Sequence, residues 1–331
     1  MRHVFACAFV LGFWMTSAAQ TAFKPVVTEQ QAPASQVEPS YPIAGSPRLD
    51  ADWERIRPIL ESYRQSHPEQ LGKTTAWNFT VGQKQTWWAT NVATSNQFEY
   101  QVPSTCKAVG INCYIFVEDS LWNSGRVTQA AVDAMQNAFD SSTPADPSKG
   151  IYQLDTQFFG NPPNVDSDPR IIILILDIKD GFSGSGGYIA GLFAPLNEYT
   201  EVQVQTLGPN RHSNQAEIYY VDGNPADLRV PSGIANASST TAHEFQHMIH
   251  WNYNGTEIAF VNEGLSESAS ALCGYGLRSP SLYFGNTNIS FLSWETTSNI
   301  LQDYSRAAIF TWYLIEQFGS GLAKQIVQSS L

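Results

Sequence analysis

The sequence predicts an α+β protein in which a β-rich N-terminal half precedes a helical C-terminal half. Apolar runs of strand length fall between residues 75 and 221, and apolar residues recur at helical spacing after Pro231. Strands followed by helices are typical of this class, whereas alternating strands and helices indicate a parallel sheet. The 331 residues suffice for one large domain or two medium ones with a sizeable core.

The first residues are typical of an export signal. Arg2 and His3 precede an apolar run that is too short to span a bilayer, and small residues at 16–19 offer a cleavage site. We therefore predict a signal peptide at 1–19 and a secreted protein without membrane association, and we disfavour a membrane anchor. Residues 20–47 contain five prolines and predict a Pro-rich linker or a short pro-segment.

The N-terminal half contains mostly predicted strands after one helix. Helical spacing predicts a helix over 50–65 and another over 128–139, with proline or glycine after each. Alternation or β-branched runs predict strands near 77–81, 98–102, 114–117, 171–178 and 217–221. The run Ile171–Ile178 is continuously apolar apart from Asp177, so this strand should be buried on both faces. A Gly-rich loop follows at 181–187.

The C-terminal half predicts three helices. They span about 238–253, 262–273 and 305–318, and glycines at 255, 274 and 319 mark their ends. Formal net charge is −12, only 15% of residues are charged, and we find no Lys/Arg cluster, so the sequence excludes an ordinary nucleic-acid binder.

Four cysteines are present, and Cys7 falls in the predicted signal. Cys106 and Cys113 lie close in sequence, and in an exported protein they are a disulfide candidate. The alternative is a pair of reduced, buried thiols. Cys273 is then left as a buried apolar residue.

Residues 243–247 read His-Glu-Phe-Gln-His, an H-E-x-x-H pattern. Residues four apart share one helix face, so His243 and His247 can each give a nitrogen to one zinc ion. Glu244 lies beside them and can act as general base on a metal-bound water. The alternative is a chance string, but apolar neighbours at 248, 249 and 251 indicate a buried helix, where unpaired histidines are costly.

A catalytic zinc needs a third protein ligand, and Glu is a common one. A turn after residue 255 would fold the segment 262–267 back onto the first helix, which favours Glu263 as that ligand over Glu267. Glu267 is predicted to orient a ligating histidine, or to replace Glu263. His250 is predicted to support the ligands rather than bind zinc. His250 and Tyr253 stand where the metzincin pattern has Gly and a third His, which excludes that pattern.

Together, residues 243–249 and 262–267 resemble the hyicolysin-like zinc metallopeptidases of bacteria, which belong to the gluzincin group with Glu as third ligand. The resemblance extends to residues 159–168 with the strand after them, to Gly187-Tyr188, and to Tyr304 with the segment 307–319. It covers most of residues 75–320, but only the motif region is specific.

This resemblance implies a zincin-like fold, extracellular proteolysis, and Glu263 in the place of the Glu in the family's Asn-Glu-Gly turn. We expect residues 48–331 to form the catalytic domain, with a β-rich half at 48–230 and a helical half at 231–331. The chain stops at Leu331, where such enzymes usually continue, so we expect a short or truncated helical half.

The predicted function is that of a zinc-dependent metalloendopeptidase acting on a protein or peptide. Glu244 takes a proton from water and passes it to the leaving amine. Tyr304, Tyr188 and His212 are alternative donors to the oxyanion, and the sequence does not choose among them. Two other functions stay open: a non-catalytic surface or adhesion module on a peptidase scaffold, and a zinc hydrolase of another substrate. Calcium is a second possible cofactor, with oxygen ligands from Asp166, Asp168, Asp177 and Asp180.

Overall fold

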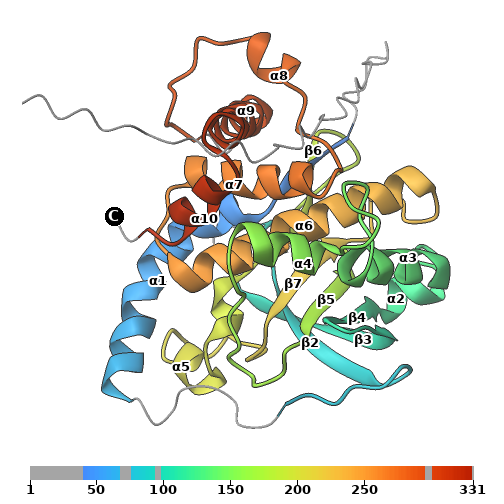
Figure 1. Ribbon diagram of the computed structural model, residues 1–331. Helices are drawn as coiled ribbons and strands as arrows, with labels where there is room; N and C mark the ends of the chain where they lie inside the picture. The colour runs from blue at the N-terminus through green and yellow to red at the C-terminus, as the bar shows by residue number, and fades with distance from the viewer. Residues whose placement is uncertain (1–39, 68–75, 94–97, 295–299, 330–331) are drawn as a thin grey trace, which may run out of the picture.

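The computed structural model describes residues 40–67, 76–93, 98–294 and 300–329. The predicted signal peptide and the predicted linker up to residue 39 lie outside the described residues. In the described part, a seven-stranded mixed sheet runs in the order β1-β6-β7-β5-β4-β3-β2, and helices pack around it (Figure 1). The fold is therefore mixed α and β, as the sequence predicts at this level.

The sheet combines parallel and antiparallel pairs. Strands β4, β5 and β7 are parallel neighbours, β2 and β3 extend the sheet by antiparallel pairing, and β6 is antiparallel to β7. On the outer side of β6, β1 pairs in parallel. The bounds of the strands are β1 (Tyr41–Ala44), β2 (Lys84–Thr90), β3 (Glu99–Val109), β4 (Cys113–Glu118), β5 (Ile171–Leu176), β6 (Gly187–Phe193) and β7 (Ile218–Asp222).

The central strand β5 shows why this sheet forms. All six of its residues are Ile or Leu and all are buried, because each face of the strand packs against its own apolar core. Ile173 and Ile175 join the core beneath the helices, whereas Ile172 and Leu174 join a second core with Phe116 on the other face. The predicted burial on both faces is confirmed, although the strand ends two residues earlier than predicted.

The helices form the outer layers. One face of the sheet carries α3, α4 and α6, and α7 lies between α6 and α9 (Figure 1). The described helices are α1 (Ser46–Ser66), α2 (Asp119–Asn123), α3 (Gln129–Asp140), α4 (Ile151–Phe158), α5 (Glu201–Gln205), α6 (Pro231–Tyr253), α7 (Ala259–Leu272), α8 (Ser281–Phe284), α9 (Ile300–Phe318) and α10 (Gly321–Val327), with a 3-10 helix η2 at Pro195–Glu198.

The division into a β-rich and a helical half is coarser than the structure. The seven strands end at Asp222 and the described chain beyond Pro231 is helical, but α1 to α5 lie among the strands. The predicted strand near 77–81 is wrong, since this stretch is irregular. Its alternation instead reflects aromatic packing: Trp77 stacks on Phe79 at 5.0 Å between ring centroids, and both rings contact Trp87.

The last part of the predicted linker is also corrected. Residues 41–44 form β1, and α1 begins at Ser46, four residues before the predicted start. The prolines did not exclude these elements, because Pro42 lies on an edge strand and Pro47 lies in the first turn of a helix, where its missing N–H costs nothing. Among the described helices, none has the length and apolar character needed to cross a membrane.

The predicted disulfide is wrong in this structure. Cys106 and Cys113 are both free and buried. They belong to the two different cores, Cys113 beneath the helices and Cys106 on the opposite face of the sheet. Residues on opposite faces of a sheet point their side chains apart, so these two sulfurs cannot meet without moving the backbone. Cys273 is likewise a buried free thiol, as predicted.

Candidate metal centre

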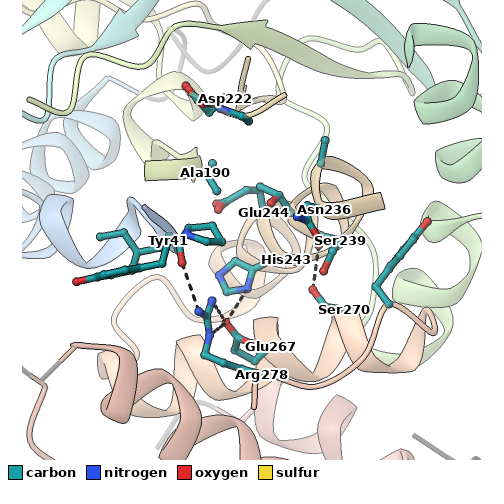
Figure 2. A pocket seen from close by; sticks show the side chains of 18 of the residues that line it. Tyr41, Ala190, Asp222, Asn236, Ser239, His243, Glu244, Glu267, Ser270 and Arg278 are labelled. Atoms are coloured by element: carbon teal, nitrogen blue, oxygen red, sulfur yellow. Dashed lines mark hydrogen bonds and ion pairs between the residues drawn. The ribbon is translucent and has the colours of Figure 1, made fainter. Parts of the chain in front are cut away.

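A cavity of about 290 Å³ lies between the outer strands of the sheet and α6 (Figure 2). Its walls come from β1, from β6 with Tyr188 and Gly191, from α6 with His243 and Glu244, and from the segment after α7. Two residues of the H-E-x-x-H pattern, His243 and Glu244, therefore face a hollow of ligand size, whereas His247 lines a smaller neighbouring pocket.

Helix α6 positions the two histidines. It begins two turns earlier than predicted, with Pro231 in its first turn, and it ends at Tyr253 before Gly255. All residues from Thr241 to His250 are buried, because the helix packs on β6 and β7 with one face and on α7 with another. The motif therefore lies on a buried helix and not on a surface helix.

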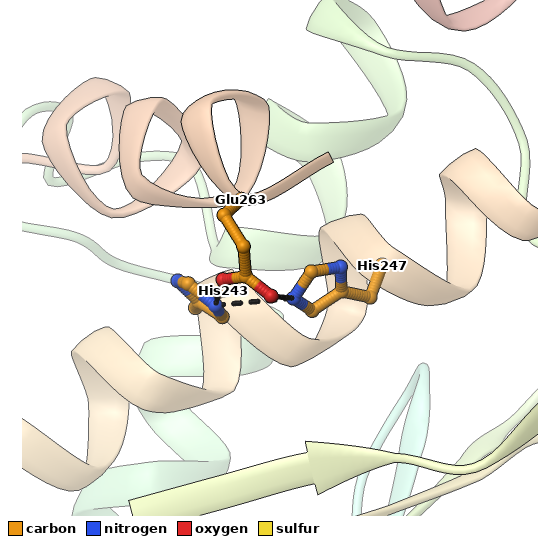
Figure 3. Close-up of side chains that lie close together, drawn as sticks. All are labelled: His243, His247 and Glu263. Atoms are coloured by element: carbon orange, nitrogen blue, oxygen red, sulfur yellow. Dashed lines mark hydrogen bonds and ion pairs between the residues drawn. The ribbon is translucent and has the colours of Figure 1, made fainter. Parts of the chain in front are cut away.

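Three side chains converge at the centre (Figure 3). The Nε2 atoms of His243 and His247 lie 3.1 Å apart. The two carboxylate oxygens of Glu263 lie 3.1 Å from Nε2 of His243 and 3.4 Å from Nε2 of His247. Within the described residues, this is the one group of three such side chains whose donor atoms all fall within 4.8 Å of one another.

Glu263 reaches the histidines because α7 packs tightly between two helices. It lies in the second turn of α7, which begins three residues earlier than predicted. The next residue, Gly264, faces α9: a Cβ atom there would lie 2.3 Å from Oγ1 of Thr311 and 3.0 Å from the carbonyl of Ala307. A side chain at 264 would therefore push α7 away from α9 and shift Glu263.

The Nδ1 atoms of His247 and His250 are held by hydrogen bonds. Nδ1 of His247 lies 3.0 Å from Oδ1 of Asn262 and 3.1 Å from Oγ of Ser266. Nδ1 of His250 lies 3.1 Å from the same Asn262 oxygen, and burial lowers the pKa of His250 to about 4. Asn262 thus aims Nε2 of His247 at the centre, and His250 supports this contact without joining the group of three.

Glu267 lies beside the centre but has another partner. Its Oε1 is 3.9 Å from Nδ1 of His243, which is too long for a hydrogen bond. The same oxygen accepts two hydrogen bonds from Arg278, at 2.9 and 2.8 Å. Glu267 is therefore bound mainly to Arg278, and the geometry favours Glu263 as the inward carboxylate.

Glu244 is fully buried, and neither of its carboxylate oxygens makes a hydrogen bond of good geometry with a described residue, although the backbone N–H of Phe193 is near enough to lower its pKa slightly. Burial raises the pKa of Glu244 to about 8, although His247 counteracts part of this effect. The backbone of β6 lies against it, since a Cβ at Gly191 would be 3.0 Å from its Oε1. A carboxyl group at the wall of a cavity, with a pKa near neutral pH, can exchange a proton with a bound molecule.

The charges around the centre suit a cation. Glu244, Glu263 and Glu267 are all at most 5% exposed, and Arg278 pairs with only one of them. Burial would raise the pKa of Glu263, but the neighbouring His247 and His243 lower it to about 2. Two imidazole nitrogens and a carboxylate in this arrangement match the donor set of a catalytic zinc site, so the residues present fit that metal.

The three candidate oxyanion donors are placed differently. Tyr188 lines the cavity. Tyr304 is fully buried, and its hydroxyl donates to the backbone carbonyl of Ala44 at 3.2 Å. His212 stacks on Trp88 of β2, a strand at the opposite edge of the sheet from β1, and pairs with Glu201 at 2.7 Å. His212 is therefore not part of this cavity, because loop packing along β2 holds it elsewhere.

The aspartates predicted as calcium ligands do not form one cluster. Asp166 and Asp168 precede β5, whereas Asp177 and Asp180 follow it. A strand of six residues spans roughly 20 Å, which separates the two pairs. Asp168 accepts a hydrogen bond from Tyr114, and Asp180 accepts one from the N–H of Ile189.

Several residues of the site were missed by sequence reasoning. Asn262 had a signal, because it precedes Glu263 in the recognised turn, but its bond to His247 depends on the packing of α7. No signal in the sequence indicated Gly191 or Arg278, since each reaches the site from outside the recognised motif.

The fold and the centre together define the chain as a candidate metalloprotein with a histidine and glutamate site. No protein-family model matches the sequence. The chain is similar to the neutral metalloprotease ShpI of Staphylococcus hyicus, with 29% identity over 199 residues, which covers 54% of this chain and 42% of that protein. The chain thus spans less than half the length of this relative, and the similarity is that of a distant bacterial metallopeptidase relative.

Proposed function

We propose that this protein is a secreted zinc-dependent endopeptidase of the hyicolysin-like type, with residues 48–331 as its catalytic domain. The observation that carries the proposal is the convergence of His243, His247 and Glu263 beside a buried, unpartnered Glu244 at a cavity wall. The name of the relative supports a metal-dependent protease. The predicted export signal supports secretion.

In this proposal His243, His247 and Glu263 hold the metal. A zinc ion in such a site acts as a Lewis acid toward the scissile carbonyl and makes water more acidic. Glu244 is the general base: its carboxylate accepts the proton of the attacking water and then delivers it to the leaving amine. Tyr188 and Tyr304 are the remaining candidates to donate a hydrogen bond to the oxyanion. Asn262 and Ser266 keep the His247 ring in the binding orientation.

The test combines metal content with turnover. We expect the purified chain to carry about one zinc ion and to cleave casein, and a chelator should abolish the cleavage. Glu244→Gln should keep zinc and thermal stability but lose about 100-fold or more in turnover. His247→Ala should lose zinc as well. Wild-type turnover in Glu244→Gln would reject the general base, and full zinc occupancy in His247→Ala would reject that ligand.

The alternative functions give different results in the same experiment. A non-catalytic surface module would bind zinc without cleaving casein, and its Glu244→Gln variant would behave like the wild type. A zinc hydrolase of another substrate would leave casein intact but lose its own activity in Glu244→Gln. A purely structural zinc site fills its fourth position with a protein ligand. Here three side chains form the candidate ligand group, and the Glu244 carboxyl lies beside them without joining it, which favours catalysis.

A further inference from the structure

Strand β1 is bound along the side of β6 that borders the cavity, and Tyr41 lies at the rim (Figure 2). Because the other side of β6 pairs with β7, this side would be an open sheet edge without β1. An open edge presents N–H and C=O groups that accept another extended chain. Here β1 takes them in parallel register, with Tyr41 opposite Gly187 and Ile43 opposite Ile189.

The edge that β1 occupies passes directly beside the proposed general base. Gly191 of β6 lies so close to Glu244 that a Cβ atom there would be 2.9 Å from the Glu244 Cγ. On its other side, the Gly191 carbonyl accepts a hydrogen bond of 2.8 Å from the N–H of Gly45. An extended peptide that pairs with β6 here is therefore brought alongside Glu244. Strand addition of this kind is a general mode of peptide recognition.

Two side chains near the centre also bind the backbone of this segment. Arg278 donates to the carbonyl of Pro42 at 3.3 Å, and Tyr304 donates to the carbonyl of Ala44 at 3.2 Å. Both contacts use backbone carbonyls, which every extended peptide possesses. The Tyr304 hydroxyl, a candidate oxyanion donor, is thus engaged by a carbonyl of the chain itself.

We propose that the free edge of β6 is the peptide-binding strand of this centre, and that residues 41–45 occupy it as an intramolecular inhibitor. This inference rests on the proposed function. The segment continues into α1, where Asp50 lines a small pocket together with His247, so the chain stays close to the centre as it leaves β1. A substrate must displace the segment to reach the edge of β6, and residues 41–45 fall within the stretch predicted as linker or pro-segment.

The test loosens β1 in the full chain. Ile43 is 4% exposed and anchors β1 in the core beside Ile189 and Leu192, so Ile43→Asp should release the strand. Ile59 lies on α1 and is 45% exposed, so Ile59→Asp is a matched control. We expect Ile43→Asp to cleave casein faster than the wild type by about tenfold or more, because the open form gains population. The control should match the wild type.

A second variant keeps the test decisive if Ile43→Asp does not fold. Gly45 has an ordinary φ of −87°, so alanine fits its backbone conformation. An added Cβ would, however, lie 2.7 Å from the Cβ of Leu192 and 2.9 Å from Cγ2 of Ile189. Gly45→Ala should therefore push β1 from β6 without removing an apolar side chain. Hydrogen exchange at the amides of Tyr41 and Gly45, which donate to β6 and the loop before it, reports the release directly.

Binding separates this inference from the proposed function. In the Glu244→Gln background, where turnover is expected to be slow enough for a binding measurement, either β1 variant should bind a fluorescein-labelled casein peptide about tenfold more tightly. Unchanged binding together with faster exchange at Gly45 would overturn the inference. Lower turnover or weaker binding would overturn it too, because β1 would then be a wall of the substrate cleft. If no variant cleaves casein, the proposed function fails, while the binding measurement still decides whether β1 blocks a peptide site.

Discussion

The contact between α7 and α9 predicts that Gly264→Ala disturbs the metal centre although residue 264 does not face it. The new Cβ would lie 2.3 Å from Oγ1 of Thr311, where ordinary contact begins at 3.4 Å, so the helices must separate locally by about 1 Å. Overpacking of this kind costs about 1–3 kcal/mol, and the higher helix propensity of alanine offsets about 0.5–1 kcal/mol of it.

The free energy of unfolding of Gly264→Ala should therefore fall by about 1–2 kcal/mol. For a chain of 331 residues this corresponds to a melting temperature that is lower by about 1.5–3 °C. Because Glu263 moves with its neighbour, turnover at saturating zinc should fall by about 100-fold. Thr311→Ala removes the nearest clashing atom, so the double variant should recover about 1 kcal/mol. Gly321→Ala is the control, since nothing lies within 4 Å of its Cβ.

The measurements are calorimetry for stability and casein cleavage for activity. Gly264→Ala with wild-type stability and turnover would refute the packing argument. A double variant no better than Gly264→Ala would show that Thr311 is not the obstacle.

Three further predictions follow from other contacts. Asn262→Ala should weaken zinc binding about 10- to 100-fold in a competition titration, while Asn262→Asp, which keeps an acceptor, should retain more affinity. Burial raises the pKa of Glu217 from 4.5 to about 8, so the folded chain holds a proton that the unfolded chain releases. The free energy of unfolding should thus fall as the pH rises from 4.5 to about 8, by about 1 kcal/mol per pH unit. Glu217→Gln should flatten the slope in urea titrations and the exposed Glu54→Gln should not; an unchanged slope would contradict this. Cys106 and Cys113 should both react with a thiol reagent on unfolding without reductant, and a missing pair of thiols would reveal a bridge.

The regular elements with strong periodicity were predictable to within a few residues, apart from the start of α6, which lies two turns before the predicted one. The strand at β5 and the helices α3, α6 and α7 were recognised from local patterns, because their apolar residues repeat at the period of the element. Short elements such as α4, and β2 with its polar start, were missed. The aromatic stretch from Trp77 was misassigned, because packing between distant rings imitates strand alternation.

The sequence alone determined which residue types were available for a metal centre and that two of them share a helix face. His243 and His247 are four residues apart, so any helix through them brings their rings together. The local order of α6, a turn and α7 also indicated Glu263 as the third candidate, because a short connection between helices returns the chain antiparallel.

Only the tertiary structure decided what surrounds that centre. Arg278 on Glu267, Gly191 against Glu244, and β1 along the edge of β6 join parts of the chain that are far apart in sequence. The spacing of apolar residues along the chain does not predict such contacts, since they depend on how whole elements pack. The separation of Cys106 from Cys113 has the same cause: compartment and spacing allowed a bridge, but the sheet sends the two side chains to opposite faces.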